Sequence, residues 1–187
     1  MFLEGNRWRK QPPNIKGNNR KVFSFFKKQT VTSDFLASHY AETIQNAQQH
    51  FLETPKESNY INELKEGELH QIVAELWSIQ ALTFELLLGL YTSRKIATRA
   101  SSMLIVGYFP IDHKNHIINT HYYGPIINDA AYGNGSYPIK EISEAVFQKL
   151  SINNKDLDKY LQSFLKGNYC GLEDSIENIN KRYKIVL

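Results

Sequence analysis

The sequence is poor in sulfur, with one cysteine and two methionines among 187 residues. One cysteine cannot build an internal disulfide framework or a cysteine-based zinc site. Low-complexity tracts and internal repeats are also absent, which excludes repeat architectures. After Met1 only two apolar residues precede Glu4, and no longer apolar run follows up to Lys21, so we expect no signal peptide and a reducing, cytoplasmic location.

Apolar runs free of charge are lacking too. The most apolar stretch, residues 68–91, has about the length that crosses a bilayer, but it contains Glu75 and Glu85. An ionised carboxylate near the centre of a bilayer is energetically costly. We therefore predict that this stretch is the buried core helix of a globular protein and that the chain has no membrane span.

The overall composition is that of a globular protein, with 42% apolar and 22% charged residues. A chain of this length can form one ordinary domain with a sizeable core. Eleven tyrosines and ten phenylalanines supply large side chains for the core and for partner surfaces. We expect a single domain over residues 22–187.

Residues 68–91 show the periodicity that predicts a central helix. Apolar residues recur at three- and four-residue steps, which aligns them on one helical face; these are Ile72, Leu76, Ile79, Leu86 and Leu90. A second apolar face lies beside the first and comprises Val73, Trp77, Phe84, Leu88 and Tyr91. A helix that is apolar around most of its circumference must be covered on most sides.

The flanking segments predict further helices, about seven in total, and hence a mainly α fold. A helix over roughly 34–53 would be capped by Ser33, and Gln48 would lie on its solvent-facing side. Breaking residues 54–58 and a helical turn near 59–66 would precede the central helix. The remaining predicted helices are 138–150, 155–166 with Gly167 as its C-terminal cap, and 172–183.

Two segments are harder to assign. Helical character can continue past Thr92 to about Gly107, but residues 102–123 also fit one small β-hairpin with its turn near Pro110. A short apolar run bounded by proline is ambiguous by periodicity alone. Residues 124–138 hold three glycines and two prolines, and we predict a loop there.

Charge is distributed unevenly along the chain. Residues 1–30 carry eight Lys or Arg against one acidic residue, whereas residues 31–187 carry fourteen basic and eighteen acidic residues. Residues 1–21 lack a hydrophobic period, and we predict a basic, flexible arm. Its candidate polyanion-binding residues, with neighbours up to residue 28, are Arg7, Trp8, Arg9, Lys10, Lys16, Arg20, Lys21, Lys27 and Lys28. The alternative is a solvated tail.

The one cluster with catalytic residue types is Asp112, His113, His116 and His121. Histidines with a carboxylate can hold a divalent metal or act as general base on water. The spacing matches no H-E-x-x-H or comparable motif. Ordinary histidines in a polar loop are the alternative. Glu75 and Glu85 lie about 15 Å apart along a helix, too far for an acid/base pair, and we expect each to be solvated or paired with Arg94, Arg99 or a lysine.

These patterns favour a non-enzymatic, macromolecule-binding protein, of the toxin-neutralising immunity or adaptor kind, without a metal or cofactor. The expected partner is another protein met through the aromatic-rich body. The first alternative is a small metal-dependent nuclease or hydrolase that uses Asp112, His113, His116 and His121. The second is a nucleic-acid-binding protein that uses residues 1–28. The sequence contains no pattern that identifies the partner.

Overall fold

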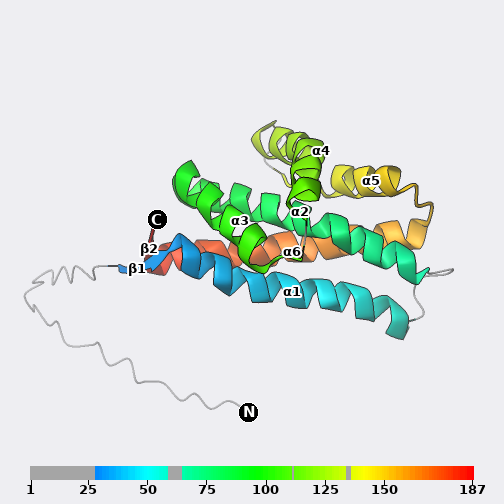
Figure 1. Ribbon diagram of the computed structural model, residues 1–187, viewed down its shortest axis with the longest axis horizontal. Coiled ribbons are helices and arrows are strands. Elements are labelled where there is room, and N and C mark those ends of the chain that lie inside the picture. Colours follow the sequence, from blue (N-terminus) through cyan, green and yellow to red (C-terminus); the bar gives the residue numbers. More distant parts are fainter. Residues whose placement is uncertain (1–27, 59–64, 111, 134–135) are drawn as a thin grey trace, which may run out of the picture.

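Six helices and two short strands account for most of the residues that the structure, a computed structural model, describes: 28–58, 65–110, 112–133 and 136–187 (Figure 1). In chain order they are β1 (Gln29–Thr32), α1 (Ser33–Ser58), α2 (Glu66–Tyr91), α3 (Arg94–Tyr108), α4 (His113–Gly133), α5 (Ile139–Leu150), α6 (Lys155–Arg182) and β2 (Tyr183–Val186). The prediction of a mainly α single domain is confirmed, with six helices where about seven were expected.

Helix α2 is the centre of the fold, as its apolar periodicity predicts. It packs against each of the other five helices. Figure 1 shows α1, α2 and α6 running side by side along the long axis, with α4 and α5 on one side of α2. By length and composition Gly67–Tyr91 could cross a membrane, but 67% of its most apolar window is buried inside the protein. This burial is that of a core helix.

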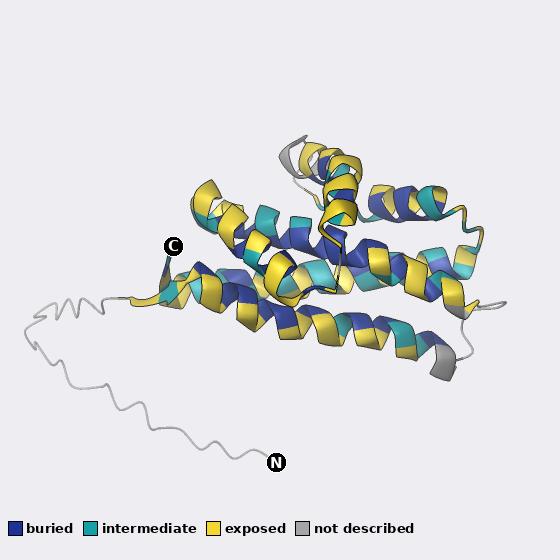
Figure 2. Ribbon diagram, in the orientation of Figure 1, coloured by how far each residue is buried: buried dark blue, intermediate teal, exposed yellow. Residues whose placement is uncertain are grey.

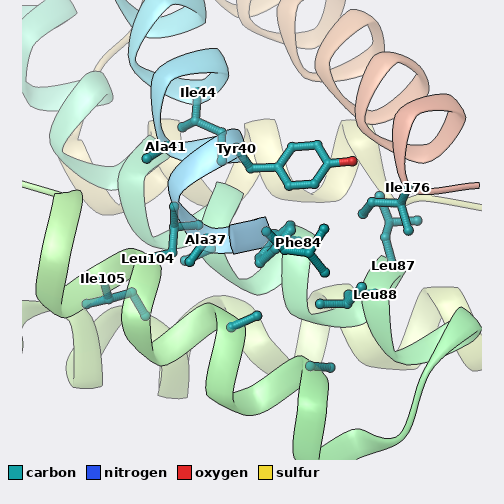
Figure 3. Packing of buried hydrophobic residues seen from close by; sticks show 14 of the residues in the cluster. Ala37, Tyr40, Ala41, Ile44, Phe84, Leu87, Leu88, Leu104, Ile105 and Ile176 are labelled. Atoms are coloured by element: carbon teal, nitrogen blue, oxygen red, sulfur yellow. The ribbon is translucent and has the colours of Figure 1, made fainter. Parts of the chain in front are cut away.

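Two hydrophobic clusters lie on two faces of α2. The first joins Trp77, Phe84 and Leu88 to α1, α3, α6 and β2, and Figure 3 shows part of it. The second joins Leu69, Ile72, Leu76 and Ile79 of α2 to α4, α5 and α6. Of the residues predicted to face the core, Leu90 is an exception, because the end of α2 leaves it 58% exposed.

The two strands pair in parallel at one end of the domain. Gln29 lies opposite Tyr183, and the register continues to Thr32 opposite Val186. The Lys28 ammonium donates to the backbone carbonyl of Asn180 at 2.7 Å, which adds a contact to the end of α6. The sequence did not predict this pairing, because two four-residue strands far apart in the chain leave no local signal.

The predicted hairpin over 102–123 is wrong. Helix α3 ends at Tyr108 and α4 starts at His113, so both halves of that segment are helical. Phe109 separates the helices with an extended backbone, and Pro110 explains why, since the residue before a proline is disfavoured in the helical region. The helical alternative for this segment is confirmed, although α3 begins anew at Arg94 with Ser93 as its cap.

The predicted breakers at 54–58 and 124–138 are wrong over most of their length. Helix α1 continues through Pro55 to Ser58, and α4 continues through Pro125 to Gly133. A proline inside a helix removes one backbone hydrogen bond. Tertiary packing outweighs that loss in α4, where Tyr123 and Ile127 on either side of Pro125 are fully or almost fully buried.

The helix predicted over 138–150 is confirmed as α5, but the two predicted after it are one continuous helix of 28 residues, α6. Gly167 lies inside α6 and caps nothing. The helix predicted over 34–53 exists and begins at Ser33, while the Thr32 hydroxyl accepts from the Phe35 amide at 3.2 Å.

Gln48 was expected on a surface and is 2% exposed. The predicted arm over residues 1–21, and most of the predicted turn at 59–66, lie outside the described residues.

Candidate functional site

The three histidines of the sequence cluster line one groove between α3 and α4. This groove, here called the histidine groove, has a volume of about 240 Å³ and is bordered on the α3 side by Ile105 and Val106. His113, His116 and His121 reach it from the first turns of α4, which is a helix and not the loop or hairpin expected. The three imidazoles therefore border one groove, spread along about 12 Å of α4.

Asp112 is absent from the lining of this groove. It precedes α4 and caps it: a carboxylate oxygen accepts from the Asn115 amide at 3.4 Å, and its carbonyl accepts from the His116 amide at 3.0 Å. Among the described residues, no three His, Cys, Asp or Glu side chains are grouped so that they could hold a metal ion. The geometry therefore offers no support for a metal-assisted reaction at these residues.

His116 connects the groove to the interior. Its Nδ1 lies 3.2 Å from the Ser78 hydroxyl of α2. Burial lowers the pKa of His116 below its ordinary value, and the neighbouring His113 lowers it further. An imidazole with a lowered pKa is neutral at pH 7.

A network of polar side chains lies behind Ser78, between α2, α4 and α5. The Lys149 ammonium of α5 donates to the Glu75 carboxylate at 2.6 Å and also to the Asn119 side-chain carbonyl. Tyr123 donates its hydroxyl to the same Glu75 oxygen at 3.0 Å, and the Asn119 amide donates to Ser78 at 3.2 Å. This network, here called the Glu75–Lys149 network, ties three helices together.

The Glu75–Lys149 network and Ser78 have the residue types of a catalytic relay, but the serine is not accessible to a substrate. Ser78 is completely buried, so its hydroxyl cannot reach a bound substrate. The carboxylate beside Tyr123 and burial both raise the pKa of that phenol, which stays protonated and serves as a donor. A largely buried ion pair that is hydrogen-bonded to neighbouring side chains fixes the orientation of the elements that carry it.

Sequence reasoning found part of this network. A lysine partner for Glu75 was one of the expectations, and the structure provides Lys149; Glu85 instead accepts from the Thr98 hydroxyl at 2.6 Å. Asn119 and Tyr123 were missed. Their four-residue spacing, which aligns them on one face of α4, was the available signal, but it is informative only once the segment is known to be helical.

Exposed apolar side chains are concentrated at the end of α3 and in the first half of α4, and two of them, Val106 and Ile117, line the histidine groove. Of the eight large apolar side chains found exposed in the described residues, five lie between residues 106 and 122. Val106 has the largest exposed fraction, 78%. Figure 2 shows the exposed face of α4 and the neighbouring end of α3. We define the α3–α4 surface as the histidine groove together with Val106, Tyr108, Ile117, Ile118 and Tyr122.

This surface belongs to a basic segment of an acidic body. Residues 94–122 carry four basic side chains and one acidic side chain, Asp112, whereas residues 31–187 as a whole have more acids than bases. Arg99 forms an ion pair with Asp34 at 3.3 Å. Arg94, Lys95 and Lys114 are exposed, so their charges face solvent.

The predicted polyanion-binding residues lie almost entirely outside the described part of the chain. Lys28 is the exception, and its ammonium donates to the end of α6. Their role therefore stays a prediction. Comparisons with protein-family models, with curated proteins and with solved structures found no match for this chain.

Proposed function

We propose that this protein acts by binding another protein through the α3–α4 surface. The observation that carries the proposal is the concentration of exposed apolar side chains between residues 106 and 122. Scattered exposed apolar residues are ordinary on a protein surface, whereas a contiguous group marks an interaction site. Here Val106 and Ile117 border the same groove.

The shape of this surface suits a protein partner. The histidine groove has room for one large apolar side chain, and such anchors in pockets dominate the binding energy of protein interfaces. Imidazole rings, with an apolar body and polar edges, can pack against that anchor and still donate or accept hydrogen bonds. The Glu75–Lys149 network behind the groove keeps α4 in a fixed orientation, which lowers the entropic cost of binding.

The exposed basic side chains of α3 and α4 indicate the charge that a partner would carry. Lys114 is exposed beside His113 of the groove, and Arg94 and Lys95 are exposed at the start of α3. A partner with acidic residues around an apolar anchor would therefore be attracted and oriented. The exposed charges of Arg94, Lys95 and Lys114 would also speed association with an acidic partner at low ionic strength. The specific role that we propose is binding to an acidic protein, either to inhibit it, as a toxin-neutralising immunity protein does, or to connect it to another protein, as an adaptor does.

Photo-crosslinking tests where the partner binds. A photo-reactive phenylalanine analogue replaces Val106 in one variant and Leu90, exposed at the end of α2, in a matched control. In cells of the native host, we expect a protein adduct from position 106 and none from position 90. Equal adducts at both positions, no adduct at position 106, or adducts to nucleic acid would contradict the proposal.

Affinity measurements with the crosslinked partner then test the energetics. Val106→Ser should weaken binding about tenfold or more, the effect of removing an apolar contact at the centre of an interface. Leu90→Ser should leave the dissociation constant unchanged. Both side chains are more than half exposed, so neither substitution should alter the thermal stability by much. A partner that binds both variants equally well does not use this surface.

A further inference from the structure

A separate pocket lies on the opposite side of α2, between α1, α2, α6 and Tyr137 before α5. Its volume is about 370 Å³, within the range of pockets that hold small molecules. Ile44, Leu165 and Leu172 form apolar parts of its wall, and Tyr137 and Tyr169 stack with ring centres 4.4 Å apart. We call it the α1–α6 pocket.

No charged side chain lines the α1–α6 pocket in the described part of the chain. The phenols in the wall add no charge at neutral pH. Burial raises the pKa of Tyr137, and burial together with the Glu173 carboxylate raises the pKa of Tyr169 to about 12. A pocket without charge or counter-charge discriminates against ionic ligands, because an ion would lose its hydration without compensation.

Two carboxamides supply hydrogen-bond donors in the wall. Gln80 is 5% exposed and donates one amide hydrogen to the Asn168 side-chain carbonyl at 3.2 Å, and Asn168 donates one to the Phe164 carbonyl at 3.1 Å. Each amide group has two hydrogens, so one remains on each side chain. A ligand that presents an acceptor to Gln80 and Asn168 would use these remaining donors.

Gln48 extends this chain of hydrogen-bonded carboxamides beyond Gln80, and one of its hydrogen-bonding groups has no partner in the described part of the chain. Gln48 donates to the Gln80 carbonyl, but the Gln48 carbonyl oxygen is buried with no hydrogen-bond partner among the described residues. A buried acceptor without a donor is destabilising, and such groups are rare in folded proteins. Gln48 itself does not line the α1–α6 pocket, so the pocket's polar wall is formed by Gln80 and Asn168 and not by this unpaired oxygen.

Tyr137 offers an acceptor. The Thr83 hydroxyl donates to the Ile79 carbonyl at 2.8 Å, so the hydrogen in the contact between Thr83 and Tyr137 comes from the phenol. The lone pairs of the Tyr137 oxygen remain for a donor on the ligand. On another side of the pocket, Tyr40 extends from α1 toward α6 and donates to the Ser175 hydroxyl at 3.0 Å (Figure 3).

Two exposed glycines of α6, Gly167 and Gly171, border the pocket. Both lie inside the helix, where glycine costs about 0.5–1 kcal/mol relative to alanine. A Cβ atom at either position would meet nothing within 4 Å, so neighbouring atoms do not require glycine. Both residues line the pocket. A larger side chain at either position would therefore be accommodated at the border of the pocket without a clash.

We infer that the α1–α6 pocket binds a neutral, mainly apolar small molecule that carries a carbonyl-type acceptor. The acceptor faces the amides of Gln80 and Asn168, and the apolar body lies against the stacked tyrosines. This site is separate from the α3–α4 surface and does not depend on the proposed protein binding.

A neutral fluorescent ketone, 6-propionyl-2-dimethylaminonaphthalene, is the probe for this inference. We expect saturable binding with a blue shift of its emission, because the dye leaves water for an apolar site. The anionic dye 8-anilinonaphthalene-1-sulfonate, which shares the naphthalene ring, should bind at least tenfold more weakly. Equal or tighter binding of the anion, or a ketone signal that does not saturate, would overturn the inference.

Filling the pocket tests the location. Gly167→Leu and Gly171→Leu should each weaken binding of the ketone at least tenfold, while Gly107→Leu, the same change at an exposed glycine of α3 that does not line the pocket, should leave it unchanged. The melting temperatures of the two α6 variants should stay equal or rise, since leucine is the better helix former. Undiminished binding in both folded α6 variants would show that the ketone binds elsewhere.

Discussion

The two sides of α2 bury polar groups in different ways. Toward α4 and α5, Glu75 forms an ion pair with Lys149, and Tyr123 and Asn119 complete the set of hydrogen bonds. Toward α1 and α6, Gln48, Gln80 and Asn168 form an uncharged chain that leaves one buried oxygen unpaired.

The difference follows from the cost of burial. A buried charge without a partner is far more expensive than an amide without one, so the charged side has to be closed by partners from three helices. Among the described residues, the uncharged side tolerates one buried oxygen without a hydrogen-bond partner, and this side borders the α1–α6 pocket, whose wall carries no charge. The charged side fixes the position of α4, on which the α3–α4 surface depends.

Removing the cation should have the largest effect. Breaking a buried ion pair costs about 3–5 kcal/mol, and Lys149→Met should approach the lower end because its side chain keeps 26% exposure. Adding Glu75→Gln should recover much of the loss, since glutamine is uncharged and still accepts from Tyr123. Urea denaturation of both variants checks this. A double variant no more stable than Lys149→Met would show that the unpaired charge is not the cause.

The uncharged chain should be less sensitive. Gln48→Ala removes the donor to Gln80 and should cost about 1–3 kcal/mol, the penalty for a buried acceptor left without a partner. Gln49→Ala, the next residue on the exposed side of α1, should cost under about 0.5 kcal/mol. Denaturation midpoints report both values. Equal midpoints would show that Gln48 contributes no more to stability than a surface residue, as its polarity alone would lead one to expect.

Acidification should produce the smallest effect and should act on the charged side only. The folded-state pKa of His116 is lowered, so the unfolded chain binds a proton more readily. The stability from the neutral imidazole is complete above the unfolded pKa of about 6.5 and is lost as the pH falls toward the folded value. His116→Gln should reduce the slope of stability against pH between about 7.5 and 5.5. Identical slopes for the variant and the parent protein would show that His116 does not cause the pH dependence of stability.

The comparison also separates what periodicity reveals from what it misses. The apolar repeat of residues 68–91 identified α2, and the repeat of 138–150 identified α5, because both are local properties of the chain. Proline and glycine were weighted too strongly as signals that a helix ends. Pro55, Pro125 and Gly167 all lie inside helices, where packing of neighbouring residues outweighs their local cost.

The sequence alone determined the helical class, the central helix, the basic segment near the N-terminus and the grouping of three histidines. Tertiary structure alone decided that those histidines line a groove without Asp112, that Lys149 neutralises Glu75, and that Gly167 and Gly171 border a pocket. The physical reason is range. Helix formation depends on residues three and four positions apart, whereas the ion pair joins Glu75 and Lys149, 74 positions apart, and the α1–α6 pocket joins Tyr40 and Ser175, 135 positions apart.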